Sequence, residues 1–244
     1  MILAGMSAIV TGGAVRIGRG LGRQLAERGV NLCVHYGKSS QDAEEAVREF
    51  ESLGVRAVAV SADLSQPVTA ARTLFEQANA SLGTIQILIN SASIFEKGSL
   101  QQTDEAHWDR HLAINLKAPF FLTQAFSRQL PEGVEGSIVN IVDWRGERPL
   151  PGHAAYTISK AGLIAQTRLL AQELGPAIRV NAIAPGAILP PPGETQTVFE
   201  QRANRNPLHK TGSPEEIARG MLYLLTAPFV TGEVLHITGG EELS

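Results

Sequence analysis

Short apolar segments alternate with longer amphipathic segments along the whole chain, and this alternation constrains the fold most strongly. The short segments are rich in Val and Ile and lack a polar alternation, which predicts strands buried on both faces of a sheet. We expect strands at residues 7–11, 31–36, 57–61, 85–90, 137–142, 179–183 and 234–237. We expect helices at residues 18–28, 41–53, 68–81, 105–129, 153–174 and 214–225. Alternating strands and helices predict an α/β fold with a parallel sheet covered on both faces.

Composition limits the classes of protein that need to be considered. The chain has 244 residues, of which 43% are hydrophobic, and no linker or repeat divides it, so we expect one domain over residues 1–244. A net charge of -3 without a Lys/Arg run gives no electrostatic basis for a nucleic-acid partner. No apolar stretch approaches the length of a membrane span, and the apolar start, which has no basic residues, runs directly into a glycine-rich turn. The only cysteine, Cys33, stands in an apolar run and predicts a buried thiol without a disulfide. We therefore expect a soluble, cytoplasmic protein.

A glycine-rich turn, TGGAVRIGRG, joins the first expected strand to the first expected helix at residues 11–20. In an α/β chain this position binds the pyrophosphate of a dinucleotide, because glycine permits close backbone approach and the helix N-terminus offers unpaired N–H groups. We expect Gly12, Arg16, Ile17 and Gly18 to contact the cofactor. A purely structural turn is the alternative. The strand–turn–helix context favours phosphate binding and a single-domain Rossmann-type, doubly wound sheet.

The end of the second expected strand indicates which dinucleotide binds. An NAD site usually presents Asp or Glu there to hold the ribose 2′-hydroxyl. This chain has Tyr36, Gly37, Lys38 and Ser39 instead, with no carboxylate to repel a 2′-phosphate. Arg16 in the glycine turn would add positive charge. The pattern predicts NADPH, and a solvated loop is the alternative for Lys38.

Asp63 and Leu64 close the third expected strand. The carboxylate could accept a hydrogen bond from the adenine amino group while the leucine covers a face of the ring. A helix cap is an equally good interpretation of Asp63.

A proline-rich segment, LPPPG at residues 189–193, follows the sixth expected strand. Ligands of open α/β sheets bind beyond the carboxyl ends of the strands, so residues 187–212 are a candidate substrate loop. An ordinary connection is the alternative.

Tyr156 and Lys160 are four residues apart and share one face of an expected helix. At ~5 Å and an effective dielectric constant of ~20, the ammonium would stabilise a tyrosinate by ~3 kcal/mol. We therefore expect Lys160 to lower the pKa of the phenol by roughly two units.

His107 and His111 have the spacing of some helical metal sites. No intervening glutamate or obvious third ligand accompanies them, so helix packing is the preferred interpretation and no metal is expected.

With these segments in place, the chain resembles the short-chain dehydrogenase/reductase family over its whole length. The motifs that carry the resemblance follow in the family's order: the glycine turn, then Asn90-Ser91-Ala92-Ser93, Asn115, the Tyr156/Lys160 pair and Pro185-Gly186. The resemblance implies that these residues contact NADPH, with Asn115 acting in a proton relay. It also implies a homotetramer that acts on a small molecule, with no membrane or nucleic-acid partner.

Within the family, the chain resembles the pteridine reductases and dihydromonapterin reductases. The turn fits TGxxxRxG through Arg16, and Ile94-Phe95 follows the NSAS segment, where the subgroup's phenylalanine stacks on the pterin. The subgroup's aspartate falls at Asp143, where most of the wider family has serine. Two positions depart from the wider family: Ser91 replaces an asparagine, and Ala187-Ile188-Leu189 lacks a hydroxyl group after Pro185-Gly186.

The resemblance implies hydride transfer from NADPH, with Tyr156 as proton donor and Lys160 on the ribose. Substrate contacts would come from Arg16, Ser93, Phe95, Asp143 and Tyr156. An ionised Asp143 only accepts hydrogen bonds, so it suits a donor-rich heterocycle better than a ketone. It would also raise the pKa of Tyr156 and keep it protonated.

The leading hypothesis is therefore reduction of a dihydropterin-type substrate (pteridine, dihydromonapterin or dihydrofolate) to the tetrahydro form. A broader carbonyl reductase, such as a 3-oxoacyl-carrier-protein reductase, and a non-catalytic nucleotide-binding regulator remain as alternatives. Arg145 and Arg148 could bind an acidic substrate tail, although a solvated loop is the preferred interpretation.

Overall fold

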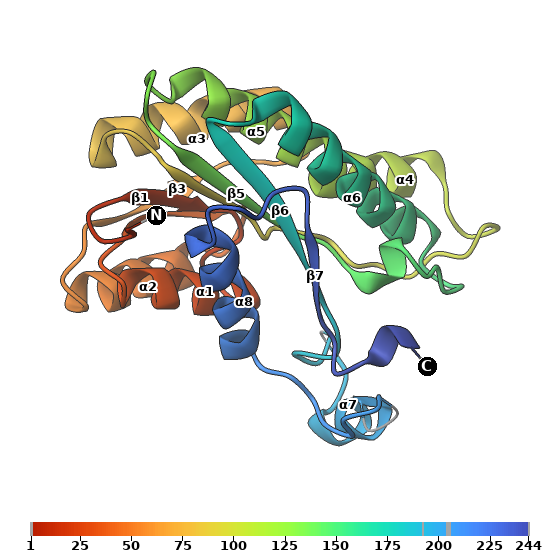
Figure 1. Ribbon diagram of the computed structural model, residues 1–244. Coiled ribbons are helices and arrows are strands. Elements are labelled where there is room, and N and C mark those ends of the chain that lie inside the picture. Colours follow the sequence, from red (N-terminus) through yellow and green to blue (C-terminus); the bar gives the residue numbers. More distant parts are fainter. Residues whose placement is uncertain (1, 192, 204–205, 244) are drawn as a thin grey trace.

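The computed structural model describes residues 2–191, 193–203 and 206–243. In this part of the chain, parallel strands form a seven-stranded sheet in the order β3-β2-β1-β4-β5-β6-β7 (Figure 1). The strands are β1 (Ser7–Val10), β2 (Asn31–Tyr36), β3 (Ala57–Ser61), β4 (Ile87–Asn90), β5 (Gly136–Ile141), β6 (Ile178–Pro185) and β7 (Val234–Ile237). The predicted doubly wound α/β fold is confirmed, and each predicted strand is present with ends shifted by at most two residues.

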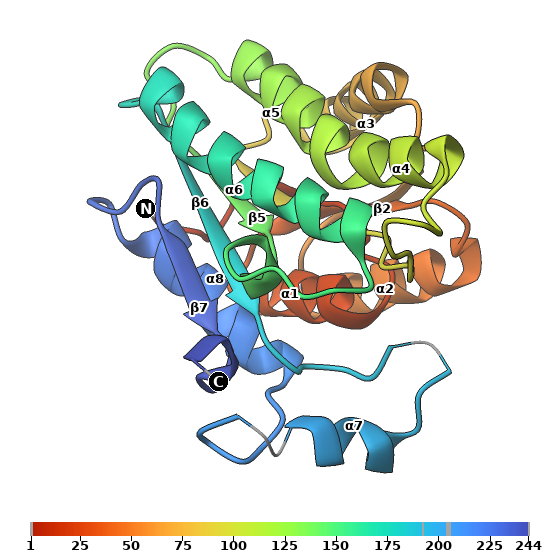
Figure 2. The same cartoon turned by 90° about the vertical axis from the view of Figure 1, so that its right-hand side faces the viewer.

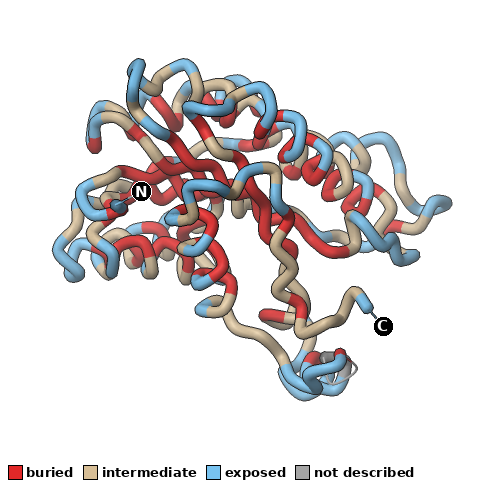
Figure 3. The backbone as a smooth tube through the Cα atoms, viewed as in Figure 1, coloured by how far each residue is buried: buried red, intermediate tan, exposed pale blue. Residues whose placement is uncertain are grey.

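Helices cover both faces of the sheet, and each face carries its own apolar core (Figures 1 and 3). One face packs against α1 (Arg16–Ala26), α2 (Ser40–Ser52) and α8 (Pro214–Thr226). The other packs against α3 (Pro67–Leu82), α5 (Ala118–Gln129) and α6 (Ala154–Leu174). β1, β4 and β5 are fully buried, which explains why their Val and Ile residues do not alternate with exposed polar residues.

The strand order reverses between β1 and β4, because β2 and β3 lie on one side of β1 and the later strands on the other. All strands run in the same direction, so the segments that follow β1, β4, β5 and β6 emerge at one edge. A topological switch point of this kind is the usual ligand-binding position of an open α/β sheet. The glycine turn and the segments that bear Phe95, Asp143 and Gly186 therefore converge at that edge.

The predicted helix at residues 105–129 is wrong as a single α-helix. α4 (Glu105–Leu112) and α5 are separated by a π-helical turn at Ala113–Lys117, in which the Ala118 N–H bonds the Ala113 carbonyl five residues back. Pro119 lies four residues after Asn115 and has no N–H, so the α-helical bond to the Asn115 carbonyl cannot form. The wider turn at this point is consistent with that missing donor.

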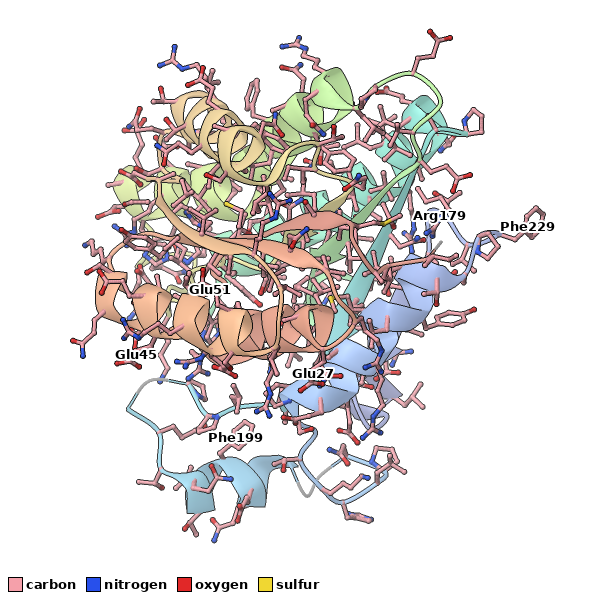
Figure 4. All side chains as sticks on the ribbon, turned by 90° about the vertical axis from the view of Figure 1, so that its left-hand side faces the viewer. Glu27, Glu45, Glu51, Arg179, Phe199 and Phe229 are labelled. Carbon is pink, nitrogen blue, oxygen red and sulfur yellow. The ribbon has the colours of Figure 1, made fainter. Side chains whose placement is uncertain are left out.

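Residues 187–212 contain a helix that the sequence reading missed, α7 (Gln196–Ala203). Figure 2 shows α7 lying apart from the helices on the sheet, and Figure 4 shows Phe199 of α7 on the side that faces the body of the molecule. Phe199 is buried, whereas most of its described neighbours in α7 are exposed. Pro192 and residues 204–205 of the predicted substrate loop lie outside the described residues.

A cavity of about 430 Å³ lies between residues 187–212 and the end of β7, and Ile188, Lys210 and Thr238 contribute to its lining.

Among the described residues, no helix is both long enough and apolar enough to cross a membrane.

Candidate active site

The glycine turn after β1 can be formed only with glycine at two of its positions. Gly12 has a φ of +65°, and a Cβ there would lie 3.1 Å from the Ala92 Cα. A Cβ on Gly18 would lie 2.2 Å from the Gly12 carbonyl oxygen. The turn, the first turn of α1 and the segment after β4 are therefore packed backbone against backbone.

The N-terminus of α1 has the properties of an anion site. Val15 precedes the helix and gives no side-chain cap, and the first turn contains no acidic residue. Arg16 begins the helix with a φ of +53°, in the left-handed region. Asp104, by contrast, caps α4 by accepting a hydrogen bond from the His107 N–H. The uncapped N–H groups of α1 and the glycine cradle beside them fit a dinucleotide pyrophosphate.

His35 supports this turn, and the sequence reading missed its role. The Gly12 N–H donates to His35 Nδ1 at 3.0 Å, and His35 Nε2 lies 3.0 Å from the Ala62 carbonyl oxygen. Nδ1 therefore carries no proton and Nε2–H is the donor, which requires a neutral ring. Burial lowers the pKa of His35 and so favours this neutral form. The only sequence signal was its place in β2, beside the predicted cofactor segment.

The segment predicted to select NADPH follows β2, and the residues predicted to hold the adenine follow β3. Lys38 is exposed and Ser39 is half-buried. Asp63 accepts a hydrogen bond from the Ser65 N–H at 2.9 Å. This bond, followed by smaller effects that include the Lys38 charge, lowers the pKa of Asp63. Asp63 therefore forms a local turn in this structure, while Leu64 beside it is buried.

Arg16 connects the glycine turn to the candidate substrate loop. Its Nη2 donates to the Pro190 carbonyl oxygen at 2.8 Å.

Asp143 and Tyr156 form a short, direct side-chain hydrogen bond. The Tyr156 hydroxyl donates to Asp143 Oδ2 at 2.7 Å. Asp143 ends the segment after β5, and its Oδ1 accepts from the Arg145 N–H at 2.8 Å, which caps a short 3-10 turn at Trp144–Gly146. Arg145 Nη1 lies 3.4 Å from Oδ2. The aspartate is thus held as an acceptor with three donors around it.

The pKa of Tyr156 is raised, whereas the spacing to Lys160 predicted that it would be lowered. We expected Lys160 to lower the pKa of the phenol, but burial, followed by the Asp143 charge and its hydrogen bond, raises it well above 10. The raising effect of Asp143 is the one the sequence reading expected. Tyr156 is therefore protonated at neutral pH and can act as an acid.

Lys160 is buried and donates to the Ile141 carbonyl oxygen at 2.8 Å, with its nitrogen 5.7 Å from the centre of the Tyr156 ring. Burial lowers the pKa of Lys160 to about 8, while the Asp143 charge opposes that shift. Desolvation of both groups therefore outweighs the direct attraction that helical spacing alone predicts.

Asn115 lies on the π-helical turn and connects three segments. Its Oδ1 accepts from the Ile94 N–H at 2.9 Å and from the Ser93 hydroxyl at 3.2 Å. Its Nδ2 donates to the Ile94 carbonyl oxygen at 3.0 Å and to the Ser159 hydroxyl at 3.1 Å. The amide therefore fixes the segment after β4 against α6 at Ser159, the residue that precedes Lys160.

Phe95 is 41% exposed and lies beside the candidate acid. Its ring meets Tyr156 edge-on with centroids 4.7 Å apart, and His153 stacks on it at 4.3 Å. The fold thus brings Phe95, Asp143, Tyr156 and Lys160 together at the edge of the sheet.

Other predicted contact residues have structural partners. Asn90 is buried and donates to Asn140 Oδ1 at 2.8 Å, so it ties β4 to β5. The Ser91 and Ala92 N–H groups donate to the Thr11 hydroxyl at 2.9 and 3.0 Å, a connection that the sequence reading missed. The Gly186 N–H donates to the Ile237 carbonyl oxygen at 3.0 Å, and Pro185 ends β6.

Together, the sheet, the uncapped glycine turn and the buried Tyr156/Lys160 pair define a dinucleotide-dependent oxidoreductase. The chain belongs to the short-chain dehydrogenase/reductase family. The family model described as enoyl-(acyl carrier protein) reductase matches residues 13–242. A short-chain type dehydrogenase/reductase from Picea abies is 32% identical over 253 residues, which cover 98% of this chain and 93% of the relative.

Named relatives and solved structures differ in the substrates that they indicate. A 3-oxoacyl-[acyl-carrier-protein] reductase from Staphylococcus epidermidis is 32% identical over 96% of this chain and 98% of its own length. The FolM alternative dihydrofolate reductase 1 from Brucella canis, complexed with NADP, is 37% identical with a TM-score of 0.95, over 100% of this chain and 96% of that chain. A blue fluorescent protein from a metagenomic library, in complex with NADPH, is 32% identical with a TM-score of 0.90, over 98% and 99%.

Proposed function

We propose that the protein catalyses NADPH-dependent reduction of a dihydropterin-type substrate, a class that includes dihydromonapterin and dihydrofolate, to the tetrahydro form. The observation that carries the proposal is the Tyr156–Asp143 hydrogen bond of 2.7 Å beside the exposed ring of Phe95. The similarity to the FolM alternative dihydrofolate reductase 1 supports the same substrate class.

Asp143 favours a nitrogen heterocycle over a ketone. An ionised carboxylate accepts hydrogen bonds and donates none, so it cannot stabilise the oxyanion that develops on a reduced carbonyl. A pterin has amino and ring N–H donors that match an acceptor, and its C=N bond needs a proton at nitrogen. Tyr156 holds a proton at neutral pH, because burial and Asp143 raise its pKa.

Phe95 supplies an apolar surface for a flat ring. Its edge-on contact with Tyr156, at 4.7 Å, places the ring beside the proton donor. A heterocycle that stacks on Phe95 would bring its ring nitrogen near the Tyr156 hydroxyl. Ser93, whose hydroxyl donates to Asn115, is exposed next to this position and could contact the same ligand. Arg16, which donates to the Pro190 carbonyl oxygen, could contact this ligand from the side of residues 187–212.

The proposed cofactor fits the residues of the chain. The Gly12–Gly18 cradle and the α1 N-terminus would hold the pyrophosphate, and Lys38 with Ser39 would hold the 2′-phosphate. When bound, NADPH supplies the hydride. Lys160 would hold the nicotinamide ribose, and the backbone carbonyl of Asn115, which lacks an α-helical donor at Pro119, would keep a water in line for returning a proton to Tyr156. Residues 187–212 would act as the substrate loop. Arg16 of the glycine turn would connect this loop to the cofactor site through its hydrogen bond to Pro190.

Reduction of a 3-oxoacyl thioester is the second candidate, because the relative from Staphylococcus epidermidis carries that name. Asp143 counts against it for the reason above. The decisive experiment follows NADPH oxidation with dihydropterin, dihydrofolate, an acetoacetyl thioester or no substrate. Turnover only with the thioester would overturn the proposal, and cofactor binding without any turnover would indicate a nucleotide-binding regulator.

Two matched variants separate the roles of the residues. Tyr156→Phe should abolish dihydropterin reduction while NADPH still binds, and full activity would refute the acid role. Asp143→Ser should impair dihydropterin turnover more than ketone turnover, and the reverse order would contradict the role of the carboxylate.

The homotetramer that the family resemblance implies also remains a proposal. Large apolar side chains are exposed on α5, α6 and α8, and Phe229, just after α8, points away from the body of the molecule (Figure 4). Such side chains are candidates for burial between subunits. Light scattering coupled to gel filtration would test the proposal, and a monomer at micromolar concentration would refute it.

A further inference from the structure

A second group of chemically active side chains lies next to Phe95, beginning with the residue that follows it in the chain. It comprises Glu96, which follows Phe95, with His107 and His111 from α4. One potential ligand atom of each residue lies within 4.8 Å of the other two. His107 Nδ1 is 3.7 Å from Glu96 Oε2. In a tetrahedral site with metal–ligand bonds of about 2.1 Å, two ligand atoms are roughly 3.4 Å apart, so only a small closure is needed.

The two histidines present suitable lone pairs. His111 is buried, and its Nδ1 lies 2.9 Å from the His107 carbonyl oxygen. A carbonyl can only accept, so Nδ1 carries the proton and Nε2 is left with a lone pair. That lone pair is not free in this structure: it accepts a long hydrogen bond from the Glu96 N–H at 3.4 Å, which a bound ion would have to replace. A backbone carbonyl on Nδ1–H is the common way to orient a metal-binding histidine.

His107 is poorly satisfied without an ion. Its Nε2 is buried with no hydrogen-bond partner, and its Nδ1 is too far from Glu96 for a good hydrogen bond. Each neutral tautomer therefore leaves one ring nitrogen without a proper partner. A cation between His107 Nδ1 and Glu96 would satisfy the nitrogen that faces the carboxylate.

We propose that Glu96, His107 and His111 bind a divalent transition-metal ion of the zinc class, with water completing the coordination. Two imidazoles and one carboxylate suit zinc or cobalt better than magnesium or calcium, which prefer oxygen ligands. Because Glu96 follows Phe95 directly, a bound ion would also tie the Phe95 segment to α4.

Arg110 is the internal competitor for this site. Its Nη2 forms an ion pair and hydrogen bond with the same Glu96 oxygen that faces His107. A bound ion would have to displace the guanidinium from that oxygen. Removal of a ligand residue should weaken metal binding, whereas removal of Arg110 should strengthen it.

The test uses the untagged full chain after treatment with a chelator. Zn²⁺ binding is measured by calorimetry, and Co²⁺ binding by the visible absorption of a low-symmetry cobalt site. We expect one equivalent per chain. Glu96→Gln and His107→Gln, both at partly exposed positions, should each weaken binding by about tenfold or more. Arg110→Gln should strengthen it by about twofold to fivefold, because it removes a competing surface ion pair.

His236→Gln is the matched control, since His236 Nε2 contacts Glu147 Oε2 at 3.0 Å, and no third metal ligand joins this pair among the described residues. Its metal affinity should equal that of the unmodified chain. No stoichiometric binding, or binding that survives both Glu96→Gln and His107→Gln, would overturn the proposal. Weaker binding in Arg110→Gln would refute the competition.

Discussion

Replacing Asp143 by Asn should lower the pKa of Tyr156, because it removes the charge and the charged hydrogen bond that raise it. Asn keeps an oxygen that can accept from the phenol, but it removes the negative charge. Two unit charges separated by the 2.7 Å between Asp143 Oδ2 and the Tyr156 hydroxyl would repel by about 6 kcal/mol at an effective dielectric constant of about 20. That energy is an upper limit, because both charges are delocalised and the Arg145 charge offsets part of the repulsion.

The sign of the effect follows from the ionised form of tyrosine. Asp143 opposes the tyrosinate, so its charge raises the pKa of Tyr156. Without that charge, tyrosinate forms at a lower pH, and the supply of protonated Tyr156 begins to fall there. The alkaline limb of kcat for the proposed reduction should therefore shift to lower pH in Asp143→Asn.

The direct assay is the absorbance of tyrosinate as a function of pH. The chain has three tyrosines, so each protein is compared with its own Tyr156→Phe counterpart and the difference isolates Tyr156. Asp63→Asn is the matched control, because Asp63 also accepts from the N–H two residues onward, at 2.9 Å, but contacts no phenol. An unchanged titration of Tyr156 in Asp143→Asn would refute the electrostatic reasoning.

Three further predictions concern single side chains. Lys160→Met should abolish turnover but raise the free energy of unfolding by about 1–2 kcal/mol near pH 7, because burial lowers the pKa of Lys160 to about 8 and so disfavours its charged form. The gain in stability should vanish by about pH 10, where the lysine is neutral in the folded chain. Urea unfolding at both pH values checks this prediction. His35→Phe should weaken NADPH binding by about tenfold, because Gly12 loses its 3.0 Å partner. Since the pKa of His35 is lowered in the folded chain, the unfolded chain binds a proton more readily below about pH 6.5. The free energy of unfolding of the unmodified chain should therefore fall with pH in that range, and it should fall less in His35→Phe. Lys38→Glu should raise KM for NADPH by roughly 10- to 100-fold and leave KM for NADH nearly unchanged, as steady-state kinetics at fixed salt would show.

Regular elements with strong patterns could be predicted from the sequence. The buried Val/Ile runs identified every strand of the sheet, and the glycine turn fell between β1 and α1 as expected. The topology then explains why Gly12, Phe95, Asp143 and Tyr156 converge although they are far apart in the sequence.

Features that depend on tertiary contact could not be predicted in the same way. The π-helical turn at Asn115 interrupts a segment whose local pattern is helical throughout, and Pro119 was its only visible signal. The roles of His35 and Thr11 depend on neighbours in other strands. Glu96 is 11 residues from His107, and the fold alone reveals it as a third potential ligand.

The pKa of Tyr156 could not be predicted from the sequence for a similar reason, because it depends on burial in the folded chain. The four-residue spacing fixes the distance between Tyr156 and Lys160, but it carries no information on how far either group is removed from water. Desolvation is the largest cause of the shift for both side chains. Burial in the folded chain therefore decided the sign for Tyr156, and the sequence supplied only the identity of the opposing carboxylate, Asp143.

For the proposed substrate, the arrangement around Asp143 would link substrate recognition to proton transfer. Tyr156 directs its proton at Asp143 Oδ2, 2.7 Å away, so the proton is not aimed at a substrate until another donor occupies that oxygen. A pterin amino or N–H group can take over as donor and free the phenol proton for the substrate nitrogen, whereas a ketone offers no donor for the exchange. A dihydropterin analogue without the amino group should therefore lose about 10- to 100-fold in kcat/KM, the effect of one hydrogen bond to a charged group. In Asp143→Asn, the two compounds should differ much less. Equal kcat/KM values for both compounds in the unmodified enzyme would show that Asp143 does not recognise the substrate through this donor.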